Sequence, residues 1–401
     1  MEPRRILLAI SGGIAAYKAP ELLRAFRKAG HEVRCALTSD AERFVSPLVL
    51  QSLSGRSVRR DLFDAGEEGE IDHIGLADWA ELVVVAPATA NRMAKLAHGL
   101  ADDLVSTVLL ATRAPVLLAP AMNVNMWSHP ATQTNLAILR SRGVELVGPE
   151  AGELACGWEG LGRMSEPGRI AEAAYSLLTA KSLVGERMLV TAGGTSEPID
   201  SVRTIMNRSS GKMGFAIASE AARRGAEVVL VAGVTSLPTP WGVRRIDVDS
   251  ALAMRDAVLA ELESISIVVK AAAVADFRPV SPVDRKLKKE DLPASGKLQL
   301  ELVQNPDILA EICRDKGSRI VVGFAAESHD VIAAAQRKLA RKGCDLIVAN
   351  DISRTDSGFE VDQNAVIFVW PDQQVEELPL LDKSGVAAQL LDRIEKLRAR
   401  R

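Results

Sequence analysis

Short apolar runs alternate with amphipathic stretches along the chain, and the alternation restarts near residue 188. Residues 19–30 have helical spacing that stops at Gly30. The apolar runs expected to form strands in the first half are 5–10, 32–38, 80–88, 114–122 and 144–149. Continuous apolar runs separated by helices predict a parallel sheet with helices on both faces. The first half is therefore expected to be a doubly wound, Rossmann-like α/β domain.

The second half repeats this style without being a close sequence repeat. Residues 188–198 predict a strand that runs into a Gly-rich turn, and 211–233 predict a helix followed by a strand. Further strands are expected at 265–277, 319–327, 345–350 and, as the last one, 365–370. The chain has 401 residues, which is long for a single core.

The boundary between the halves is expected near 182–188, after a closing helix and polar link in 170–187. Two domains are predicted, 1–181 and 187–401, each a doubly wound α/β fold. Ligands of such sheets bind beyond the carboxyl ends of the strands, so the loops at those ends are the first candidates for functional sites.

Charge and cysteine content exclude several classes of function. The net charge of −3 gives no global attraction to nucleic acid or to an acidic membrane surface. No apolar run approaches the roughly 18 residues that span a bilayer, and the N-terminal run resembles a strand more than a signal peptide. Four cysteines are far apart and form no CxxC pair, so neither a zinc site nor a disulfide framework is indicated. A reducing, cytoplasmic setting is expected.

Three strand-end loops in the first half point to a mononucleotide site. The turn "SGGIAAYK" (11–18) has small residues that let the backbone approach a ligand, and it leads into a helix start that favours a phosphate. It is not GxGxxG, and tight strand–helix packing is an equal alternative. The segments "TSD" (38–40) and "APATANRMAKLAHG" (86–99) add hydroxyls and an amide at the same edge. Ser11 and Ser39 are candidates for phosphate or ribityl oxygens.

Three further residues stand in unusual contexts. Cys156 lies in the Gly-rich "AGELACGWEGLGRM" (151–164), where a loop is expected and a thiol kept for packing is not. His73 in "IDHIGLADWA" is a candidate site residue, although a core or surface histidine is the simpler interpretation. Asn123 in "PAMNVNMW" follows a strand, where a short amide can bind a carboxylate or a flavin edge, or simply form a turn.

Together, "SGGIAAYK", "APATAN", "PAMNVNMW" and "ACGWEGLGRM" resemble the flavin-dependent cysteine decarboxylases over most of residues 1–180. The resemblance implies a flavodoxin-like fold, FMN as cofactor and a homotrimer with active sites between subunits. It implies that His73, Asn123 and Cys156 are the functional residues. The FMN-binding residues expected in matching contexts are Ser11, Gly12, Gly13, Ser39, Pro87, Ala88, Thr89, Asn91 and Ser106.

The chemistry of such a reaction explains why these groups are needed. A carboxylate beside an amide nitrogen leaves poorly, because the carbanion has no electron sink. Oxidation of the cysteine side chain to a thioaldehyde supplies that sink, and FMN can accept the two electrons. Loss of CO₂ leaves an ene-thiolate that must gain a proton during reduction. A thiol on a loop that closes over the site can donate this proton and exclude water.

Basic residues dominate the candidates of the second half. Two Gly-rich pieces flank Arg203 and Asn207 in "TAGGTSEPIDSVRTIMNRSSGKMG", but the spacing of a Walker loop is missing. Asp276 is expected at the carboxyl end of a strand. Lys286 begins a lysine run that is either a solvated face or a loop over a phosphate-rich ligand. Lys338 and Lys342 are four apart, on one helical face. Converging lysines suit a triphosphate with Mg²⁺ between them.

The motifs "TAGGTSEPID", "NRSSGKMG", "AAAVADFRP", "KLKK", "NPDIL", "GFAAE" and "DLIVAND" resemble phosphopantothenate–cysteine ligase almost end to end. Joined in this order, the halves resemble the bifunctional coenzyme A biosynthesis proteins of bacteria. The resemblance implies that CTP activates 4'-phosphopantothenate as an acyl-cytidylate, from which cysteine displaces CMP. Asn207 would act on the acyl-cytidylate and Lys286 in cysteine attack.

The same resemblance implies a substrate- and CTP-binding set. Its members are Arg203, Asp276, Lys286, Asn305, Pro306, Asp307, Ile308, Phe324, Lys338 and Lys342. Mg²⁺ is expected to be held mainly by the nucleotide phosphates, so no metal ligand is assigned. Residue spacing alone does not distinguish CTP from ATP. The expected assembly is a homo-oligomer with trimeric decarboxylase and dimeric ligase domains, hence a dodecamer.

The sequence leaves two alternatives to a bifunctional decarboxylase and ligase. A flavin-binding regulatory protein would keep the fold and lose the chemistry; the joint presence of His73, Asn123 and Cys156 argues against it. An NAD-linked dehydrogenase is disfavoured by the missing GxGxxG and by the two unlike halves.

Overall fold

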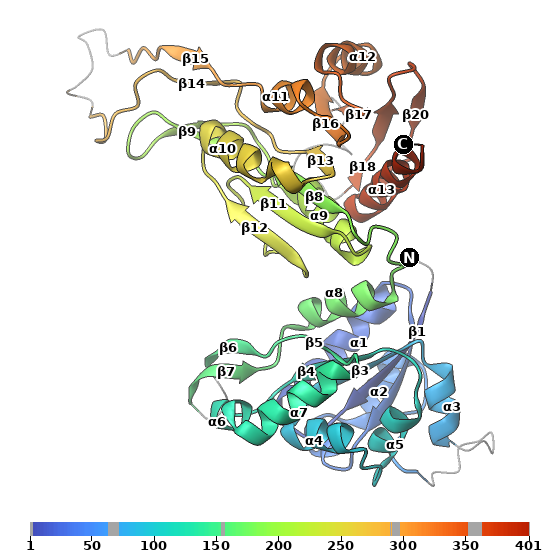
Figure 1. Cartoon of the computed structure of the whole chain (residues 1–401). Helices are drawn as coiled ribbons and strands as arrows, with labels where there is room; N and C mark the ends of the chain where they lie inside the picture. The colour runs from blue at the N-terminus through green and yellow to red at the C-terminus, as the bar shows by residue number, and fades with distance from the viewer. Residues whose placement is uncertain are drawn as a thin grey trace. The chain divides into compact units, whose positions relative to one another are not determined.

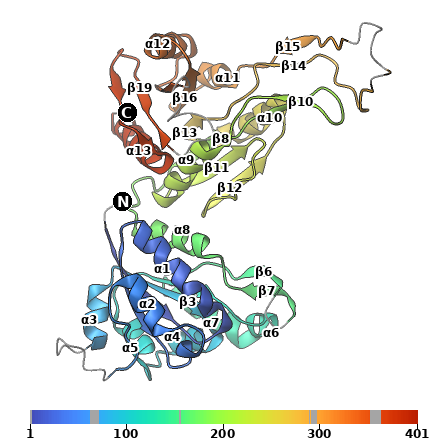
Figure 2. The same cartoon turned by 180° about the vertical axis from the view of Figure 1, so that it is seen from behind.

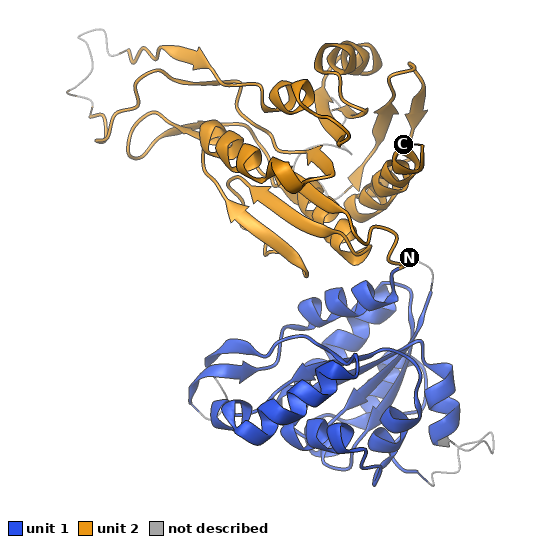
Figure 3. Cartoon of the chain, viewed as in Figure 1, with its two compact units in different colours: residues 1–179 blue, residues 180–401 orange. Residues whose placement is uncertain are grey.

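The computed structural model in Figure 1 describes residues 3–62, 72–153, 157–288, 290, 297–351 and 363–400. The chain forms two compact units, Met1–Thr179 and Ala180–Arg401 (Figure 3), which are described separately. Each unit is built on one main sheet with helices on both faces, which confirms the predicted α/β class.

The sheet of the first unit has five parallel strands in the order β2-β1-β3-β4-β5. The strands are β1 (Arg5–Ile10), β2 (Glu32–Leu37), β3 (Leu82–Ala88), β4 (Val116–Pro120) and β5 (Glu145–Leu146). This is the flavodoxin-like order, in which the chain direction across the sheet reverses between β1 and β3. The loops after these two strands therefore form the expected ligand crevice.

Helices cover both faces of this sheet (Figure 2). They are α1 (Ala19–Lys28), α2 (Pro47–Ser54), α3 (Asp72–Trp79), α4 (Ala90–His98), α5 (Leu104–Ala111), α6 (Val124–Ser128), α7 (Pro130–Ser141) and α8 (Pro167–Leu178), with short 3₁₀ turns η1 (Ile14–Lys18) and η2 (Ala41–Arg43). Apolar side chains of α3, α4, α5 and α7 form one core with the sheet. On the other face α1 packs against α8, where Phe26 meets Tyr175 edge to face.

The structure corrects two expectations in the first unit. The strand predicted at 144–149 is only the two-residue β5. The chain then enters an antiparallel hairpin, β6 (Glu150–Glu153) with β7 (Glu159–Arg163), that was not predicted. Its Gly- and Glu-rich sequence lacks the apolar alternation by which strands are recognised.

The main sheet of the second unit has eight strands in the order β12-β11-β8-β13-β16-β17-β19-β20. The strands are β8 (Arg187–Ala192), β11 (Glu227–Ala232), β12 (Val243–Asp247), β13 (Ile267–Lys270), β16 (Ile320–Glu327), β17 (Leu346–Asp351), β19 (Val366–Val369) and β20 (Val375–Glu377). The pairs from β12 to β17 are parallel and follow the Rossmann order, whereas β19 and β20 are antiparallel. In this sheet the chain direction across the sheet reverses between β8 and β13.

Two layers of helices enclose this sheet. The elements are α9 (Lys212–Arg223), α10 (Ala251–Glu261), η3 (Leu262–Ser264), α11 (Ile308–Arg314), α12 (Val331–Lys342) and α13 (Lys383–Ala399). The helices α9 and α13 share one apolar core with the sheet, while α10, α11 and α12 share another on the opposite face. Three two-stranded pairs lie outside the main sheet: β9 (Ser196–Pro198) with β10 (Thr204–Met206), β14 (Phe277–Pro279) with β15 (Leu302–Gln304), and β18 (Gln363–Asn364) with β21 (Leu381–Asp382).

One strand prediction in this unit is wrong in its extent, and another is wrong in that the strand is not the last one. The strand expected over 265–277 ends at Lys270, so Asp276 lies in the loop that follows β13 and not at the strand end. The small residues 271–275 continue as a loop that still bonds to the end of β8, for example from the Ala273 N–H to the Gly193 carbonyl at 2.9 Å. The expected last strand, at 365–370, is β19, after which β20 and β21 follow.

Candidate active sites in the two units

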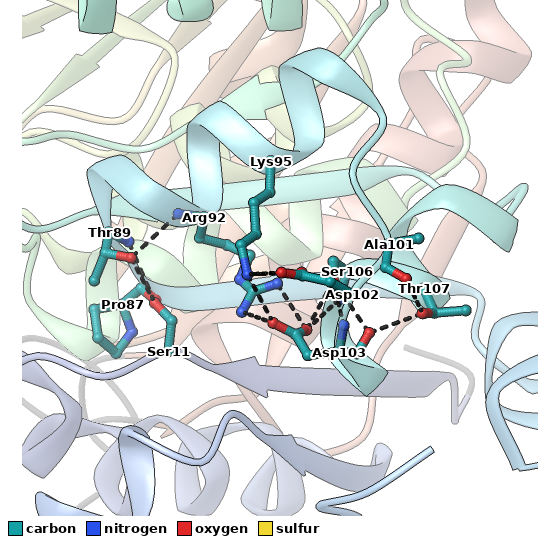
Figure 4. Close-up of polar contacts among 10 residues, drawn as sticks. All are labelled: Ser11, Pro87, Thr89, Arg92, Lys95, Ala101, Asp102, Asp103, Ser106 and Thr107. Carbon is teal, nitrogen blue, oxygen red and sulfur yellow. Dashed lines mark hydrogen bonds and ion pairs between the residues drawn. The ribbon is translucent and has the colours of Figure 1, made fainter. Parts of the chain in front are cut away.

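The loops after β1 and β3 meet at the reversal point of the first sheet (Figure 4). The Ser11 hydroxyl donates to the Pro87 carbonyl oxygen at 2.6 Å, and the Thr89 N–H donates to the Ser11 oxygen at 3.3 Å. Thr89 then caps α4 by accepting from the Arg92 N–H. Ser11 thus contacts Pro87 and Thr89, which are 76 and 78 positions away in the sequence.

Gly12 makes a third segment part of the same crevice. A Cβ at Gly12 would lie 2.3 Å from the Cβ of Asp40, so only glycine allows the turn after β1 to approach the loop after β2 this closely. Gly13 precedes η1 and provides no side-chain cap for it. Ser39 is exposed beside Asp40. This backbone cradle fits the phosphate of the mononucleotide expected from the sequence.

Unlike Ser11 and Thr89, Ser106 lies in the first turn of α5. Its hydroxyl and N–H form a capping box with Asp103 at the start of α5, and the side chain is nearly fully buried. Arg92 binds both oxygens of Asp103, at 2.9 and 2.8 Å (Figure 4). Burial opposes the charge of Asp103, but the hydrogen bonds from Arg92 and Ser106 lower its pKa overall. Ser106 therefore stabilises a helix start, while Asn91 is exposed on α4.

The three predicted catalytic residues of this unit are His73, Asn123 and Cys156. His73 lies in the first turn of α3, and its buried Nδ1 has no hydrogen-bond partner among the described residues. Asn123 caps α6 by accepting from the Asn125 N–H at 2.8 Å. Cys156 lies outside the described residues. The hairpin strand β7 bonds to the segment of Asn123, because the Met122 N–H donates to the Gly162 carbonyl at 3.0 Å.

A cavity of about 900 Å³ lies at the carboxyl edge of the second sheet. It is lined by β13, β16 and β17 residues and by the first turn of α9, as expected for ligand sites of open α/β sheets. Most of the predicted substrate- and CTP-binding residues line it: Asn207, Asp276, Asn305, Pro306, Asp307, Ile308, Phe324, Lys338 and Lys342. The structure therefore brings together residues that the sequence separates by more than a hundred positions.

Helix α12 supplies the basic wall of this cavity. The Lys338 ammonium donates to the Phe324 carbonyl oxygen at 2.8 Å, and Lys342 forms an ion pair with Asp307. Burial lowers the pKa of both lysines. Burial, with a smaller effect of the charge on Lys338, lowers the pKa of Lys270 to about 8. A bound polyanion would favour the charged forms of these lysines, so this wall is suited to phosphate groups.

Two asparagine side chains bond to the loop that follows β13 in the cavity wall. The Asn305 side chain donates to the Ala275 carbonyl at 2.9 Å, and the Asn207 side chain donates to the Val274 carbonyl at 3.1 Å. Gly214 permits the close approach of α9, because a Cβ there would lie 2.5 Å from the Cβ of Ala192 at the end of β8. The first turn of α9 is thereby held against the sheet edge.

Arg203 and Lys286 are not among the described residues that line the cavity. Arg203 forms an ion pair with the buried Asp200 at 2.6 Å and donates to the Leu287 carbonyl. The Leu287 N–H donates to the same carboxylate at 3.1 Å. Asp200 thus joins Arg203 to the segment of Lys286, whose side chain is exposed.

The cavity lining also contains residues that were not candidates from the sequence, among them Lys270, Arg341, Asn350, Asn364 and Lys383. Lys270 ends the observed strand β13 but lies in the middle of the strand predicted over 265–277, so the prediction did not place it at a strand end. Asn364 directly precedes the last predicted strand, 365–370, and Lys383 lies well after it, so neither stands directly after a predicted strand.

None of the helices in the described residues has both the length and the apolar character that crossing a membrane requires. The described residues also contain no group of three or more His, Cys, Asp and Glu side chains that could hold a metal ion.

Two family models cover nearly the whole chain. Residues 1–179 match the family described as Flavoprotein, and residues 183–397 match the DNA/pantothenate metabolism flavoprotein C-terminal domain. The chain is 46% identical over 395 residues to the coenzyme A biosynthesis bifunctional protein CoaBC of Vibrio vulnificus (strain YJ016), covering 98% of each. It is 47% identical over 393 residues to that of Escherichia coli (strain K12), covering 98% of this chain and 96% of the relative.

Solved structures resemble the two units separately. The C-terminal domain of a coenzyme A biosynthesis bifunctional protein CoaBC is 39% identical, with a TM-score of 0.48, and the match covers 55% of this chain and all of that one. A mutant PPC decarboxylase complexed with pantothenoylaminoethenethiol is 34% identical, with a TM-score of 0.40, and the match covers 43% of this chain and 97% of that one.

Proposed function

The chain belongs to the family of bifunctional coenzyme A biosynthesis proteins and combines a decarboxylase with a ligase, and we propose how its two units divide the work. The domain 187–401 joins cysteine to 4'-phosphopantothenate at the expense of CTP. The domain 1–181 then converts the product to 4'-phosphopantetheine with FMN. The reactions are consecutive, since the amide made by the ligase is the substrate of the decarboxylase.

The basic cavity of the second unit is the observation that carries the ligase assignment. Lys338 and Lys342 neutralise the phosphates of CTP, with Mg²⁺ held mainly by the same phosphates. The substrate carboxylate attacks the α-phosphate and releases diphosphate to form an acyl-cytidylate, from which the cysteine amine displaces CMP. Asn207 holds the acyl-cytidylate, and Lys286 acts in cysteine attack from the segment tied to Asp200.

FMN fits the cradle of the first unit. There Asp40 lies so close to Gly12 that a Cβ at Gly12 would have no room. When bound there, FMN supplies the two-electron oxidation and the later reduction of the substrate side chain. The turn of Ser11, Gly12 and Gly13 holds its phosphate, with the loops after β2 and β3 around it. Asn123 orients the carboxylate that is lost, His73 assists the oxidation, and the Cys156 thiol donates the proton that completes the reduction.

The family resemblance also supports a cytoplasmic homo-oligomer, with trimeric decarboxylase and dimeric ligase domains that together make a dodecamer. Active sites of the decarboxylase would then lie between subunits.

The choice of nucleotide is tested by ligation assays with CTP or ATP as the only nucleotide. The full chain, 4'-phosphopantothenate, cysteine and Mg²⁺ are expected to release CMP with CTP, at least about tenfold faster than AMP with ATP, because CTP specificity requires a difference of at least about 1.4 kcal/mol. Chelation of Mg²⁺ should abolish ligation. Equal rates with both nucleotides would contradict the proposal for CTP while leaving the ligase assignment intact.

A further inference from the structure

A buried carboxylate, Asp200, lies in the turn between β9 and β10, and 0% of its side chain is exposed. One oxygen, Oδ1, accepts hydrogen bonds from the Val202 N–H at 2.8 Å and the Arg203 N–H at 2.7 Å, which close the turn. The other oxygen, Oδ2, accepts from the Arg203 guanidinium at 2.6 Å and from the Leu287 N–H at 3.1 Å. One oxygen therefore shapes the turn, while the other binds a segment 87 positions away.

The segment that this carboxylate binds carries Lys286. Both backbone groups of Leu287 are engaged, since its N–H donates to the carboxylate and its carbonyl accepts from the Arg203 guanidinium at 3.2 Å. A third bond runs from the Val283 N–H to the Ile199 carbonyl at 3.0 Å. The main chain before and after Lys286 is thus fixed to the turn between β9 and β10, while the Lys286 side chain is exposed.

The same two strands connect this turn to the cavity. β10 ends at Met206, and the next residue, Asn207, lines the cavity and donates to the Val274 carbonyl. β10 is paired with β9 along its whole length, which limits the movement of the turn relative to the cavity wall. Asp200 therefore fixes the backbone at Lys286 relative to the residue proposed to hold the acyl-cytidylate.

The ionised form of Asp200 is the one that suits these contacts, because all the groups that bind it are donors. Burial raises the pKa of this carboxyl, but its three backbone N–H donors and the charge of Arg203 lower the pKa overall. An asparagine here can keep its oxygen on the turn, as asparagines commonly do. Its NH₂ group would then face the guanidinium and the Leu287 N–H, which are also donors, so the link to the segment of Lys286 would be lost.

We propose that Asp200 is a positioning residue of the ligase and places Lys286 for the attack of cysteine on the acyl-cytidylate. This inference rests on the proposed function, in which Lys286 acts in that step. The amine nitrogen bonds to the acyl carbon, the bond from this carbon to the oxygen of CMP breaks, and the amine releases one proton. The earlier step, formation of the acyl-cytidylate, takes place against the wall of Lys338 and Lys342. Loss of the Asp200 link therefore slows the second step and not the first.

Rapid mixing of the full chain separates the two steps. Diphosphate release from CTP without cysteine measures formation of the acyl-cytidylate, and CMP release after cysteine is added measures the attack. Asp200→Asn is expected to release diphosphate at the wild-type rate and CMP at least about tenfold more slowly, because a small displacement of a reacting group is costly. The matched control is Asp284→Asn, which removes an exposed carboxylate from the same segment and should keep both rates within about twofold.

A double substitution shows whether Asp200 acts through Lys286. Lys286→Ala should slow CMP release and leave diphosphate release unchanged. Adding Asp200→Asn to it should slow CMP release no further, whereas two independent roles would multiply their losses. Asp200→Ser keeps one oxygen for the turn and removes the other, so it provides a second variant if Asp200→Asn does not fold.

The inference is overturned if folded Asp200→Asn, or Asp200→Ser in its place, releases CMP at the wild-type rate while Lys286→Ala is slow. Equal losses in both steps, or losses that multiply in the double variant, would also overturn it, since Asp200 would then act on the fold and not through Lys286. Failure of the wild-type chain to ligate, or normal CMP release by Lys286→Ala, would instead contradict the proposed function on which the inference rests.

Discussion

Replacement of Cys156 by alanine is expected to stop the decarboxylase reaction after release of CO₂. If the thiol donates the proton that completes the reduction, its loss should lower 4'-phosphopantetheine formation by at least about 10²-fold, the usual contribution of a positioned acid. The variant should still bind FMN, because the cradle of Ser11 and Gly12 lies in other loops. Mass spectrometry should find an ene-thiol two hydrogens lighter than the normal product, while the flavin absorbance stays bleached under anaerobic conditions.

Two comparisons make this outcome specific. His73→Ala and Asn123→Ala should fail earlier, without release of CO₂, through lost oxidation or misplaced carboxylate. Cys313→Ala, which removes a thiol from the second unit, should decarboxylate at the wild-type rate. Normal 4'-phosphopantetheine from the Cys156→Ala protein would show that this cysteine is not the donor.

Replacement of Lys338 by methionine is expected to abolish most ligation and to leave decarboxylation unchanged. The ammonium lies in the cavity wall, fixed by the Phe324 carbonyl at 2.8 Å, so it needs no rearrangement to meet a phosphate. Loss of one or two charge-assisted hydrogen bonds, each about 1.5–3 kcal/mol, should lower kcat/KM for CTP by roughly 10²-fold. CMP release, followed at several CTP concentrations, measures the effect.

The matched control is Arg337→Met, which removes an exposed cation one residue earlier on the same helix. Its ligation rate should stay within about twofold of wild type, as is usual for surface substitutions. Ligation by Lys338→Met at the wild-type rate, with CTP and Mg²⁺, would remove this lysine from the site and leave Lys342 and Lys270 as the candidate phosphate ligands.

The sheet architecture could be predicted because its strands are continuous apolar runs. β1, β3 and β16 lie within the ranges expected for them, and both reversal points follow from the strand orders that such βα repeats adopt. The hairpin of β6 and β7 could not be predicted, because its glycines and glutamates carry no period-2 signal.

The candidate sites were predictable where they follow strands. Ser11 and Thr89 converge because neighbouring parallel strands end at one edge, and Phe324 lies within β16 beside the cavity. Asn364 and Lys383 were not predictable, because β18, which pairs with β21 just before α13, had no strand signal in the sequence. The capping of α5 by Ser106 was not predicted from the sequence, and its expected role toward FMN stays a prediction.

The central claim is that one chain holds two separate sites that act in sequence. It is tested most directly by mixing the Cys156→Ala and Lys338→Met proteins with 4'-phosphopantothenate, cysteine, CTP and Mg²⁺, and measuring 4'-phosphopantetheine by mass. Each protein alone should form little, because each lacks one step. The mixture should form it at a rate that rises with the concentration of either protein, since the first makes the amide that the second decarboxylates. A mixture that forms none, although each variant retains its single activity, would contradict two independent sites linked by a released intermediate.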